Sequence, residues 1–527
     1  MAVTRAPAGV VYTPREVCEP MVKLALGPLL GRRELRICDP AIGEGAFLIE
    51  IVRTLGDALA MPYRYVAERC IYGVDIDPRA VATSRAAVED FVGARIPALA
   101  EHLRVADALA CEWPMRFDAL VGNPPYIRQE LLANKAALRE FTAYDGVADL
   151  YVYFIELAHR IARRYCLIVP NKWMTAAYGR PLREFLAGAN SVEGIVDFAR
   201  GLPLFADADA FPCILWGTTD APRATARACR VTAPTTVAAA LASAPIVQPT
   251  WAADPWHIDD PADAELIARI TRRWPTLAQV IPERPSRGVV TGCNRAFVID
   301  AETRARLIAD EPAAASLIRP FIKGRDVRRW QPAPIDRYIL LIDRGTSLPR
   351  RVRAHLATFR SALEPRPGDH VGPWPGRKPG AYRWYELQDP VVPLAKSRAP
   401  RLFYQDIQTA PACCLDPTGE LVPDTTVWIL PTADPFLLAV LNSPLYAWYA
   451  RRRFPPALNG AVRPKLEYMR ALPIAEPSLS LRRRIAQLVT RQLREPDPAL
   501  DRELADLVCD AYALSAAERA RIYADGN

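Results

Sequence analysis

Short apolar runs alternate with helix-period stretches over the first 220 residues, and this pattern restricts the fold more than any other feature of the chain. Strands that alternate with helices favour a parallel sheet whose two faces are covered by those helices. We therefore predict an α/β domain in residues 1–220. The expected strands are residues 35–38, 70–74, 104–105, 119–121, 166–169, 192–198 and 213–216, and the expected helices are residues 15–30, 46–55, 79–93 and 150–164.

The rest of the 527-residue chain follows three other patterns. Around residues 221–263 the alternation gives way to Ala, Pro and Thr, and we predict a connecting segment over residues 221–283. Residues 284–475 are rich in Pro, Arg and Trp and contain short β-type runs, which favours a mixed α/β domain. Residues 476–527 carry Leu and Ala at helical spacing, which predicts C-terminal helices.

The positive charge of the chain lies in its second half. The formal net charge is +8, and residues 1–250 carry 27 basic and 27 acidic side chains against 40 and 32 in residues 251–527. Ten basic and three acidic residues fall between Arg319 and Arg353, and this asymmetry suggests a polyanion partner for the second half of the chain. From charge alone the alternative stays open, because the chain has sixty Arg against seven Lys and arginine also replaces lysine on solvated faces.

Several classes of protein are excluded by patterns that the sequence lacks. It has no charged-then-apolar N-terminal signal segment and no apolar run of about eighteen residues that could span a bilayer. The eleven cysteines include no C-x-x-C pair, and the five histidines show no H-x-x-x-H spacing. We expect a reduced, cytoplasmic protein with no membrane segment and no metal site.

A glycine-containing loop follows the first predicted strand. It begins at Asp39 and reads Asp-Pro-Ala-Ile-Gly-Glu-Gly-Ala-Phe-Leu. Gly43 and Gly45 allow the backbone to turn sharply and approach a ligand, above the N-terminus of the next helix. A glycine loop alone is often just a tight turn, and this one lacks the Lys-Ser/Thr of a nucleotide phosphate loop.

Acidic residues follow the next two predicted strands. Asp75 stands in Gly-Val-Asp-Ile-Asp-Pro, where its carboxylate can accept hydrogen bonds from both ribose hydroxyls of a nucleoside. Asp107 follows the strand at 104–105 and can reach an adenine amine. Taken alone, each acidic residue is more often a helix cap or a surface charge. Three such sites in strand order favour a nucleoside cofactor.

The tetrapeptide Asn123-Pro124-Pro125-Tyr126 follows the strand at residues 119–121. The prolines fix the backbone, so that the Asn123 side-chain oxygen and the Pro124 carbonyl can both accept hydrogen bonds from one planar amine. The ring of Tyr126 can stack on the heterocycle that carries this amine. Such an arrangement indicates chemistry on an exocyclic NH2 group, with no covalent intermediate and no reactive cysteine.

Taken together, these segments resemble the S-adenosylmethionine-dependent amino-DNA methyltransferases, and residues 12–17 are similar to the cofactor-closing segment of their gamma group. The resemblance implies a Rossmann-like methyltransferase sheet, S-adenosylmethionine as cofactor, and methylation of the N6 amine of an adenine flipped out of double-stranded DNA. The implied catalytic residues are Asn123, Pro124 and Tyr126, with Tyr126 and Phe205 against the flipped base. The implied cofactor-binding residues are Thr13, Asp39, Pro40, Ala41, Gly43, Gly45, Asp75, Ile76, Asp107, Ala108 and Asn123.

The resemblance continues into the second half. Residues 287–297 and 321–330 are similar to segments of a TaqI-like target-recognition domain, and residues 500–512 resemble the closing helices of such proteins. The resemblance implies a site-specific methyltransferase in a restriction-modification or phage-defence context. It also implies that residues 284–475 are the target-recognition domain, and we expect residues 319–353 to be part of its DNA-facing surface. The implied DNA-binding residues are Arg287, Asn294, Lys323, Arg325, Arg328 and Arg329.

Other functions of this sequence stay open. The same tetrapeptide serves enzymes that methylate cytosine N4, RNA bases or protein glutamine, because all of these present a planar amine. A built-in nuclease is disfavoured, since no lysine has an acidic residue two positions earlier and little chain precedes the first motif. We expect any nuclease to be a separate partner. A catalytically inert DNA-binding subunit is disfavoured because every catalytic position is filled.

Overall fold

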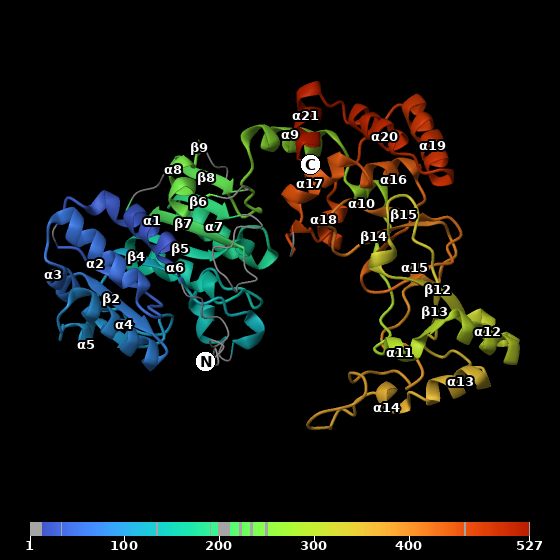
Figure 1. Ribbon diagram of the computed structural model, residues 1–527, viewed down its shortest axis with the longest axis horizontal. Coiled ribbons are helices and arrows are strands. Elements are labelled where there is room, and N and C mark those ends of the chain that lie inside the picture. The colour runs from blue at the N-terminus through green and yellow to red at the C-terminus, as the bar shows by residue number, and fades with distance from the viewer. Residues whose placement is uncertain are drawn as a thin grey trace. The chain divides into compact units, whose positions relative to one another are not determined.

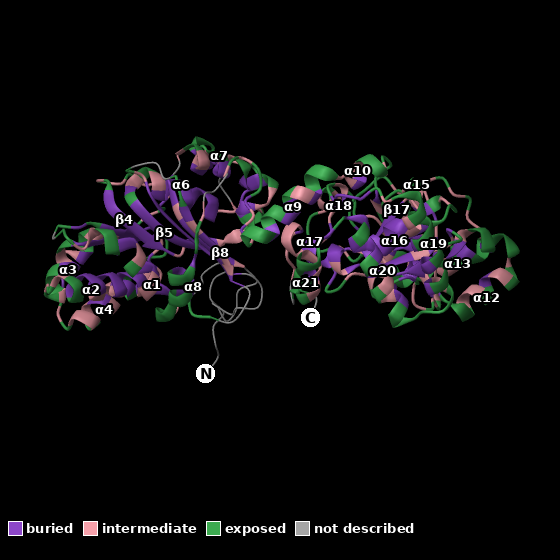
Figure 2. Cartoon of the chain, turned by 90° about the horizontal axis from the view of Figure 1, so that it is seen from above, coloured by how far each residue is buried: buried purple, intermediate pink, exposed green. Residues whose placement is uncertain are grey.

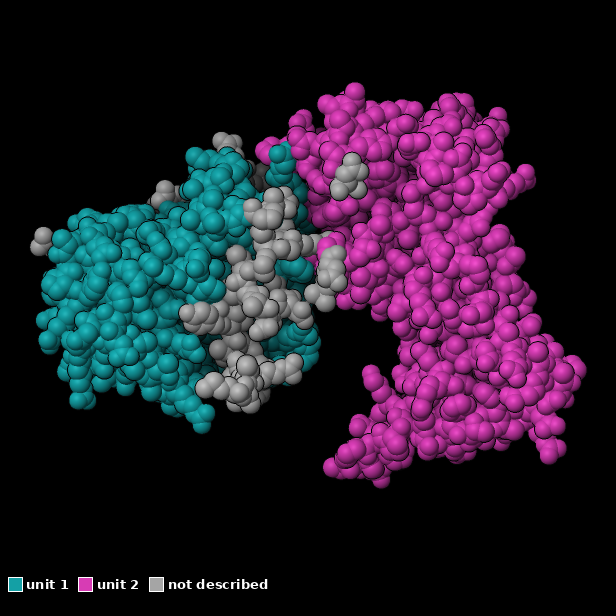
Figure 3. All heavy atoms as spheres, viewed as in Figure 1, with its two compact units in different colours: residues 1–260 teal, residues 261–527 magenta. Residues whose placement is uncertain are grey.

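The chain divides into two units, residues 1–260 and 261–527 (Figure 3). The computed structural model describes residues 13–32, 34–132, 135–189, 191–198, 211–220, 224–231, 235–247, 251–457 and 460–525. Each unit buries its own sets of apolar side chains. None of the helices in these ranges is both long and apolar enough to cross a bilayer.

A mixed sheet, with nine strands in the described residues, forms the centre of the first unit (Figure 1). Its order is β3 (Leu103–Val105), β2 (Ile71–Asp75), β1 (Ile37–Asp39), β4 (Phe117–Gly122), β5 (Ala162–Pro170), β7 (Pro212–Thr218), β6 (Val192–Phe198), β8 (Ala226–Val231) and β9 (Ile246–Val247).

Strands β3, β2, β1, β4 and β5 are parallel to their neighbours, so their carboxyl ends share one edge of the sheet. Strand β7 runs antiparallel to both β5 and β6. Strands β2 and β3 lie on one side of β1, and β4 and β5 lie on its other side. The strand order therefore reverses between β1 and β4. Ligands of open α/β sheets bind at such a reversal, outside the carboxyl ends.

Helices cover both faces of this sheet, and the strands are buried on both sides (Figure 2). Successive strand residues pack into opposite cores: Ala119 and Val121 lie in one, and Leu120 lies in the other. Such burial explains the nearly continuous apolar runs of the sequence. One core contains residues of α1 (Arg15–Leu26), α2 (Ala46–Leu59), α3 (Tyr63–Arg69), α4 (Pro78–Val92), α5 (Leu99–His102) and α8 (Val237–Ser243), and the other contains residues of α6 (Tyr151–Ile161) and α7 (Arg180–Ala189).

Each of the seven strands predicted from the sequence overlaps an observed strand. The prediction of a loose connection after residue 220 is wrong for residues 226–247, because β8, α8 and β9 continue the sheet and its core. The Ala- and Thr-rich composition hides these elements. Strand β8 carries Arg227 and Arg230 at half-buried positions, and Arg230 Nε donates to Asp197 Oδ2 at 3.1 Å.

Gly194 of β6 offers a test of this packing. A Cβ there would lie 2.1 Å from the Trp216 ring and 2.6 Å from the Arg227 carbonyl oxygen, so neighbouring strands would have to move. We expect Gly194→Ala to destabilise the first unit by about 2–3 kcal/mol, as overpacking of a core does. Gly188→Ala is the matched control: nothing lies within 4 Å of its Cβ position in α7, and we expect no loss. Thermal and urea unfolding would measure the stability of both variants. Equal unfolding midpoints for Gly194→Ala and Gly188→Ala would contradict the close packing at Gly194.

Two small sheets and two helical groups form the second unit. One sheet has the order β10 (Ser286–Arg287), β17 (Val427–Leu430), β14 (Arg401–Gln405) and β15 (Cys413–Asp416). The other has the order β11 (Val298–Asp300), β13 (Arg337–Leu340), β12 (Ile318–Ile322) and β16 (Val422–Pro423). A mixed α/β unit is therefore present, as the sequence predicts.

The apolar residues of the second unit form two cores. One contains residues of α9 (Pro261–Arg273), α10 (Leu277–Val280), α16 (Pro435–Leu441), α17 (Pro444–Arg453), α18 (Leu466–Arg470), α19 (Leu479–Arg494), α20 (Pro498–Ala511) and α21 (Ala516–Ala524). The other contains residues of α11 (Asn294–Phe297), α12 (Ala301–Asp310), α13 (Arg350–Ala357), α14 (Arg360–Leu363) and α15 (Pro393–Lys396).

The C-terminal helices that the sequence predicts are observed, but they are not a separate tail. Leu266 and Ile270 of α9, in the segment predicted as a connection, lie in the same core as Val508 of α20. Arg269 Nη2 also donates to Glu518 Oε1 at 2.5 Å. The first helix after residue 260 and the last helices of the chain therefore stabilise one another.

Candidate active site

The predicted site residues of the first unit meet at the carboxyl edge of the sheet. Asp39 ends β1 and pairs with Gly73 of β2, while Gly122 ends β4 on the other side. A Cβ on Gly122 would lie 2.6 Å from Asp39 Oδ1, so the backbone just before Asn123 packs directly against this carboxyl group. The strand reversal thus brings the loop after β1 and the loop after β4 together.

The loop between β1 and α2 is held by Asp75 at the end of β2. Gly43 N donates to Asp75 Oδ2 at 3.0 Å, and Asp77 N donates to Asp75 Oδ1 at 2.9 Å. Gly43 and Gly45 have φ values of 49° and 88°, in the left-handed region that favours glycine. Gly45 caps α2, so its turn places the helix N-terminus beneath the loop. Asp75 therefore shapes the loop as well as standing at the predicted ribose position.

Asp39 is buried, with 1% of its surface exposed. Its Oδ1 accepts a hydrogen bond from Ala41 N at 3.1 Å, but its Oδ2 is buried with no hydrogen-bond partner among the described residues. Burial raises the pKa of Asp39 to about 7, with a smaller contribution from the Asp75 charge, while the Ala41 hydrogen bond opposes the rise. A buried carboxylate with an unused oxygen fits a cationic ligand group.

Two exposed apolar side chains flank Asp75. Ile76 is 73% exposed, and Val105, which pairs with Asp75 across β2 and β3, is 52% exposed. The resemblance implied Ile76, whereas Val105 was missed because an apolar residue inside a short predicted strand gives no signal of its own. Together they can contact the faces of a planar ring.

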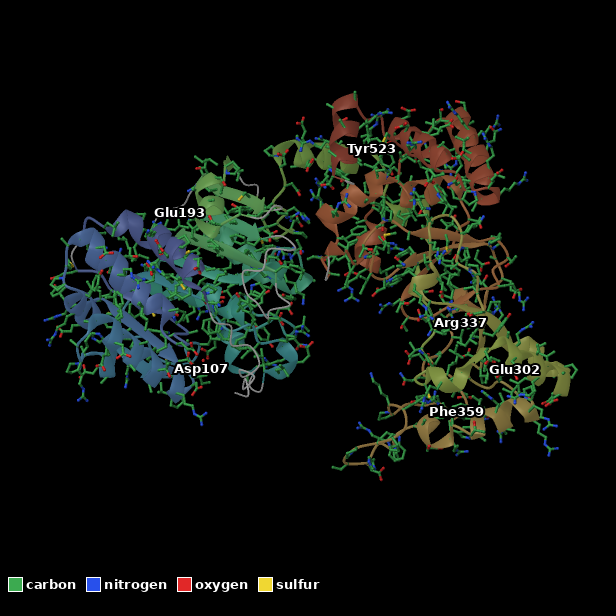
Figure 4. All side chains as sticks on the ribbon, viewed as in Figure 1. Asp107, Glu193, Glu302, Arg337, Phe359 and Tyr523 are labelled. Carbon is green, nitrogen blue, oxygen red and sulfur yellow. The ribbon has the colours of Figure 1, made fainter. Side chains whose placement is uncertain are left out.

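Asp107 lies beyond β3 at the carboxyl edge, whereas Glu193 of β6 lies at the amino edge (Figure 4). Asp107 is exposed, and its Oδ1 accepts from Leu109 N at 2.9 Å. It therefore caps a turn and still presents its other oxygen. Ala108 is buried, and its carbonyl accepts from Trp113 Nε1 at 3.1 Å.

Thr13 joins the N-terminal segment to the loop after β4. Asn123 Nδ2 donates to Thr13 Oγ1 at 3.0 Å, and Thr13 is 5% exposed. Pro124 is buried and Asn123 is half-buried. The contact was not predicted, since the two residues stand 110 positions apart, and it orients the Asn123 amide.

Two contacts hold the side chain of Tyr126 in place. Its hydroxyl donates to the Ile168 carbonyl at 3.3 Å, and its ring meets that of Tyr151 edge-on with centroids 6.5 Å apart. Burial raises the pKa of the Tyr126 phenol well above its usual value, so the ring stays neutral. Phe205, the other residue implied against the base, lies outside the described residues.

Two of the six predicted DNA-binding residues are engaged within the protein. Arg287 Nη2 lies 2.7 Å from Asp406 Oδ2. Arg329 Nη1 lies 3.0 Å from Asp501 Oδ2 of α20, and its Nη2 donates to the Asn442 carbonyl at 3.0 Å. Both arginines remain partly exposed. However, the contacts of Arg287 link β10, and those of Arg329 link the segment after β12, to other parts of the second unit.

The other four lie at or near the surface. Asn294 is exposed and accepts from Thr291 Oγ1 at 2.7 Å, and Lys323 is half-buried. Arg325 and Arg328 are exposed; Arg325 lies 4.0 Å from Asp326, a weak ion pair.

The expectation that residues 319–353 form a DNA-facing surface is wrong for part of the stretch. Arg319 is 4% exposed, and its Nε donates to the Glu420 carbonyl at 2.9 Å. Arg337, in β13, is paired with the buried Asp326. These guanidiniums carry sufficient donors to stabilise loops internally, which a count of charges along the sequence does not reveal.

Comparison with known proteins identifies relatives over nearly the full chain. Residues 94–205 match the family described as Eco57I restriction-modification methylase. The chain is 27% identical over 564 residues to the type II methyltransferase M.PaeR7I of Pseudomonas aeruginosa, covering 98% of this chain and 94% of that protein. It is 25% identical over 574 residues to the type II methyltransferase M.XhoI of Xanthomonas vasicola, covering 97% and 98%.

Among solved structures, the type IIL restriction-modification enzyme MmeI, determined in complex with DNA, is similar with a TM-score of 0.60 and 15% identity. The match covers 96% of this chain and 74% of MmeI. The fold prediction is confirmed: the chain has an α/β architecture with a large mixed sheet, similar to that of MmeI, with a further mixed unit and helices.

Proposed function

We propose that the chain, a relative of the type II restriction-modification DNA methyltransferases, transfers a methyl group from S-adenosylmethionine to the N6 amine of adenine in double-stranded DNA. The observation that carries this proposal is that Asp39 packs against the Gly122 backbone, directly before Asn123 and Pro124, at the strand reversal. A cofactor bound by Asp39 and an amine held by Asn123 and Pro124 would be neighbours, and proximity of the two reactants is a large part of such catalysis.

The cofactor-binding residues fit the chemistry of S-adenosylmethionine. Asp39 Oδ2 would accept from the cofactor's ammonium group, and the Gly43–Gly45 turn would approach its methionine portion. Asp75 would hold the ribose hydroxyls, and Ile76 and Val105 would contact the adenine ring. When bound, the cofactor supplies an electrophilic methyl group on a sulfonium ion. The rest of the proposed cofactor set consists of Thr13, Pro40, Ala41, Asp107, Ala108 and Asn123.

The Asn123-Pro124 segment would hold the amine that receives the methyl group. An adenine amine is a poor nucleophile because its lone pair is conjugated with the ring. Asn123 Oδ1 and the Pro124 carbonyl would each accept one N–H bond and draw the nitrogen toward a tetrahedral geometry. The hydrogen bond from Asn123 Nδ2 to Thr13 Oγ1 supports this role, since it fixes which side of the amide presents the oxygen.

Tyr126 would stack on the flipped adenine, and the structure separates the role of its ring from that of its hydroxyl. We expect Tyr126→Ala to lower kcat/KM about 30- to 100-fold, because stacking on one base contributes about 1–3 kcal/mol. Tyr126→Phe keeps the ring and loses only the bond to the Ile168 carbonyl, so activity should stay within about threefold. Methylation kinetics on one duplex would measure both, and equal losses would contradict a stacking role.

The identity of the methylated atom is tested by product analysis. Purified protein would be incubated with labelled S-adenosylmethionine and, separately, with genomic DNA, total RNA and a protein extract. Digestion of the DNA to nucleosides should yield N6-methyladenine. N4-methylcytosine, or label only in RNA or in protein glutamine, would contradict the proposal. A protein that binds no S-adenosylmethionine by calorimetry would instead be an inert DNA-binding subunit.

The biological setting follows from the same activity. A site-specific adenine methyltransferase would protect its recognition sequence from a separate nuclease partner in restriction-modification or phage defence. Sequencing of modified adenines in cells that express the chain should find one recurring sequence. Methylation at random adenines would contradict a protective role.

A further inference from the structure

Many arginines of the second unit stabilise its loops. Arg377 is buried, and its guanidinium donates to the carbonyl oxygens of Leu363, Thr291 and Glu386 at 2.8, 3.0 and 2.7 Å. Arg344 donates to the carbonyl of Gln388 at 2.7 Å. These contacts hold the segment between α14 and α15, residues 364–392, against the core. In Figure 1 this segment extends away from the sheets beyond α14, and Figure 4 marks Phe359 at its base.

Three other arginines line a hollow that this segment forms together with α13. The hollow measures about 790 Å³, and its lining includes Arg353 of α13, Arg366 and Arg383, with the rings of Tyr382, Trp384 and Tyr385. All three arginines are exposed. A hollow of this size is far larger than one phosphate group and can accept a nucleotide-sized portion of a ligand.

The carboxylates near this hollow make their closest contacts elsewhere, and the Glu386 charge acts on Arg383 only at longer range. Over the ranges that the structure describes, none of these three guanidiniums is within ion-pair distance of a carboxylate. Glu364, the acid in the lining, accepts from Arg360 Nε at 2.6 Å. The buried Glu386 accepts the backbone N–H groups of Gly345 and Arg383, at 3.1 and 2.8 Å.

Aromatic rings orient two of the guanidiniums. Arg353 lies 5.0 Å and Arg383 lies 5.9 Å from the centroid of the Tyr385 ring, and Arg383 Nη1 donates to Tyr385 Oη at 2.6 Å. A guanidinium has five N–H donors, so Arg383 keeps most of its donors for a ligand. Stacking on a ring also reduces the conformational entropy that such a side chain loses on binding.

We propose that this hollow binds the sugar–phosphate backbone of duplex DNA and sets the position of the DNA on the second unit. The proposal rests on the proposed function, because it takes the DNA substrate from there. Planar guanidiniums match phosphate oxygens in a bidentate manner, and backbone contacts of this kind fix the register in which other residues read the bases. Arg353 ends the basic stretch that the sequence analysis already assigns to a DNA-facing surface, whereas Arg366 and Arg383 lie outside that stretch and outside the segments that resemble a target-recognition domain.

The test removes the three charges together in R353A/R366A/R383A. Fluorescence anisotropy with a duplex of about 30 base pairs would follow the Kd over a range of salt concentrations. We expect the Kd to rise at least about tenfold and the slope of log Kd against log salt to fall by about 2–3, at about 0.9 per lost phosphate contact. Arg502→Ala is the matched control, because Arg502 is an exposed arginine on α20, a helix whose apolar residues pack in the other core of the unit. It should change neither quantity.

An unchanged Kd and an unchanged slope in the triple variant would overturn the proposal. It would also be overturned if the wild type bound duplex RNA or polyglutamate as tightly as DNA and if that binding depended on the same three arginines. Thermal melting and S-adenosylmethionine binding check the fold, and the single variants replace the triple variant if it melts early. The two proposals fail separately. If the triple variant loses DNA binding but the wild type methylates no DNA, the proposed role of the hollow is supported and the proposed function is contradicted. If the wild type methylates DNA but the triple variant binds DNA normally, only the proposed role of the hollow is contradicted.

Discussion

Replacing Asn123 by Ala should lower methyl transfer at least about 1,000-fold, because two acceptors activate the amine and this change removes one of them. The Pro124 carbonyl alone cannot hold both N–H bonds. The amide also donates to Thr13 Oγ1, so the variant releases the N-terminal segment from the loop after β4. Single-turnover methylation of a duplex would measure the loss in the chemical step.

Binding of S-adenosylmethionine should stay within about threefold in this variant, since Asp39 and Asp75 supply the proposed charged contacts. Thr13→Val is the companion variant: it keeps Asn123 but removes its hydrogen-bond acceptor. We expect an intermediate loss of about tenfold, the usual effect of losing one orienting hydrogen bond. Full activity of Asn123→Ala, with the cofactor bound normally, would rule out the proposed catalytic role of this loop.

The fold of the first unit follows from local patterns. Strands buried on both faces give continuous apolar runs, and the helices between them have one apolar face, so both are visible in the sequence. Two of the elements that escaped prediction, β8 and α9, depend for their burial on partners distant in sequence. Strand β8 is stabilised through Arg230 and Asp197, and α9 through residues near the C-terminus, such as Glu518. No local pattern encodes such pairings.

The candidate site was predictable where one motif supplies several groups at once. Asp39 and Asp75 each end a parallel strand and Asn123 directly follows one, so the strand order alone brings them to one edge. The Thr13–Asn123 bond and the role of Asp75 in holding Gly43 depend on side-chain placement, and the sequence shows neither.

The arginines illustrate the limit most clearly. Arg319 and Arg353 bound the same basic stretch, yet Arg319 is buried among carbonyl groups and Arg353 lines an open hollow. The difference lies in how many acceptors the surrounding loops provide. Charge density along a sequence therefore indicates a basic unit but does not distinguish a structural guanidinium from one that is available to a ligand.

The variant D39N should weaken S-adenosylmethionine binding about 100-fold, since it removes a buried charge that would pair with the cofactor's ammonium group. In wild type, binding should release protons near neutral pH, because Asp39 has a pKa of about 7 without the ligand and must be ionised to pair with a cation. Calorimetry in buffers of different ionisation enthalpy would detect this release, and affinity should rise with pH through 7. D39N should lose both effects.

Asp39 should also make the stability of the cofactor-free protein depend on pH. The free energy of unfolding should fall as the pH rises, whereas the affinity for the cofactor should rise. The raised pKa means that the folded chain holds a proton on Asp39 that the unfolded chain has released above its ordinary value of 3.8. This contribution to the free energy of unfolding is complete below that value and is lost as the pH rises to about 7. Between pH 5 and 8, cofactor-free wild type should therefore lose about 2–3 kcal/mol that D39N does not lose. Asp77→Asn, on an exposed helix cap, is the control and should show neither effect. If D39N bound the cofactor with normal affinity but still lacked the pH-dependent loss of stability, Asp39 would be a buried structural acid and not a cofactor-binding residue.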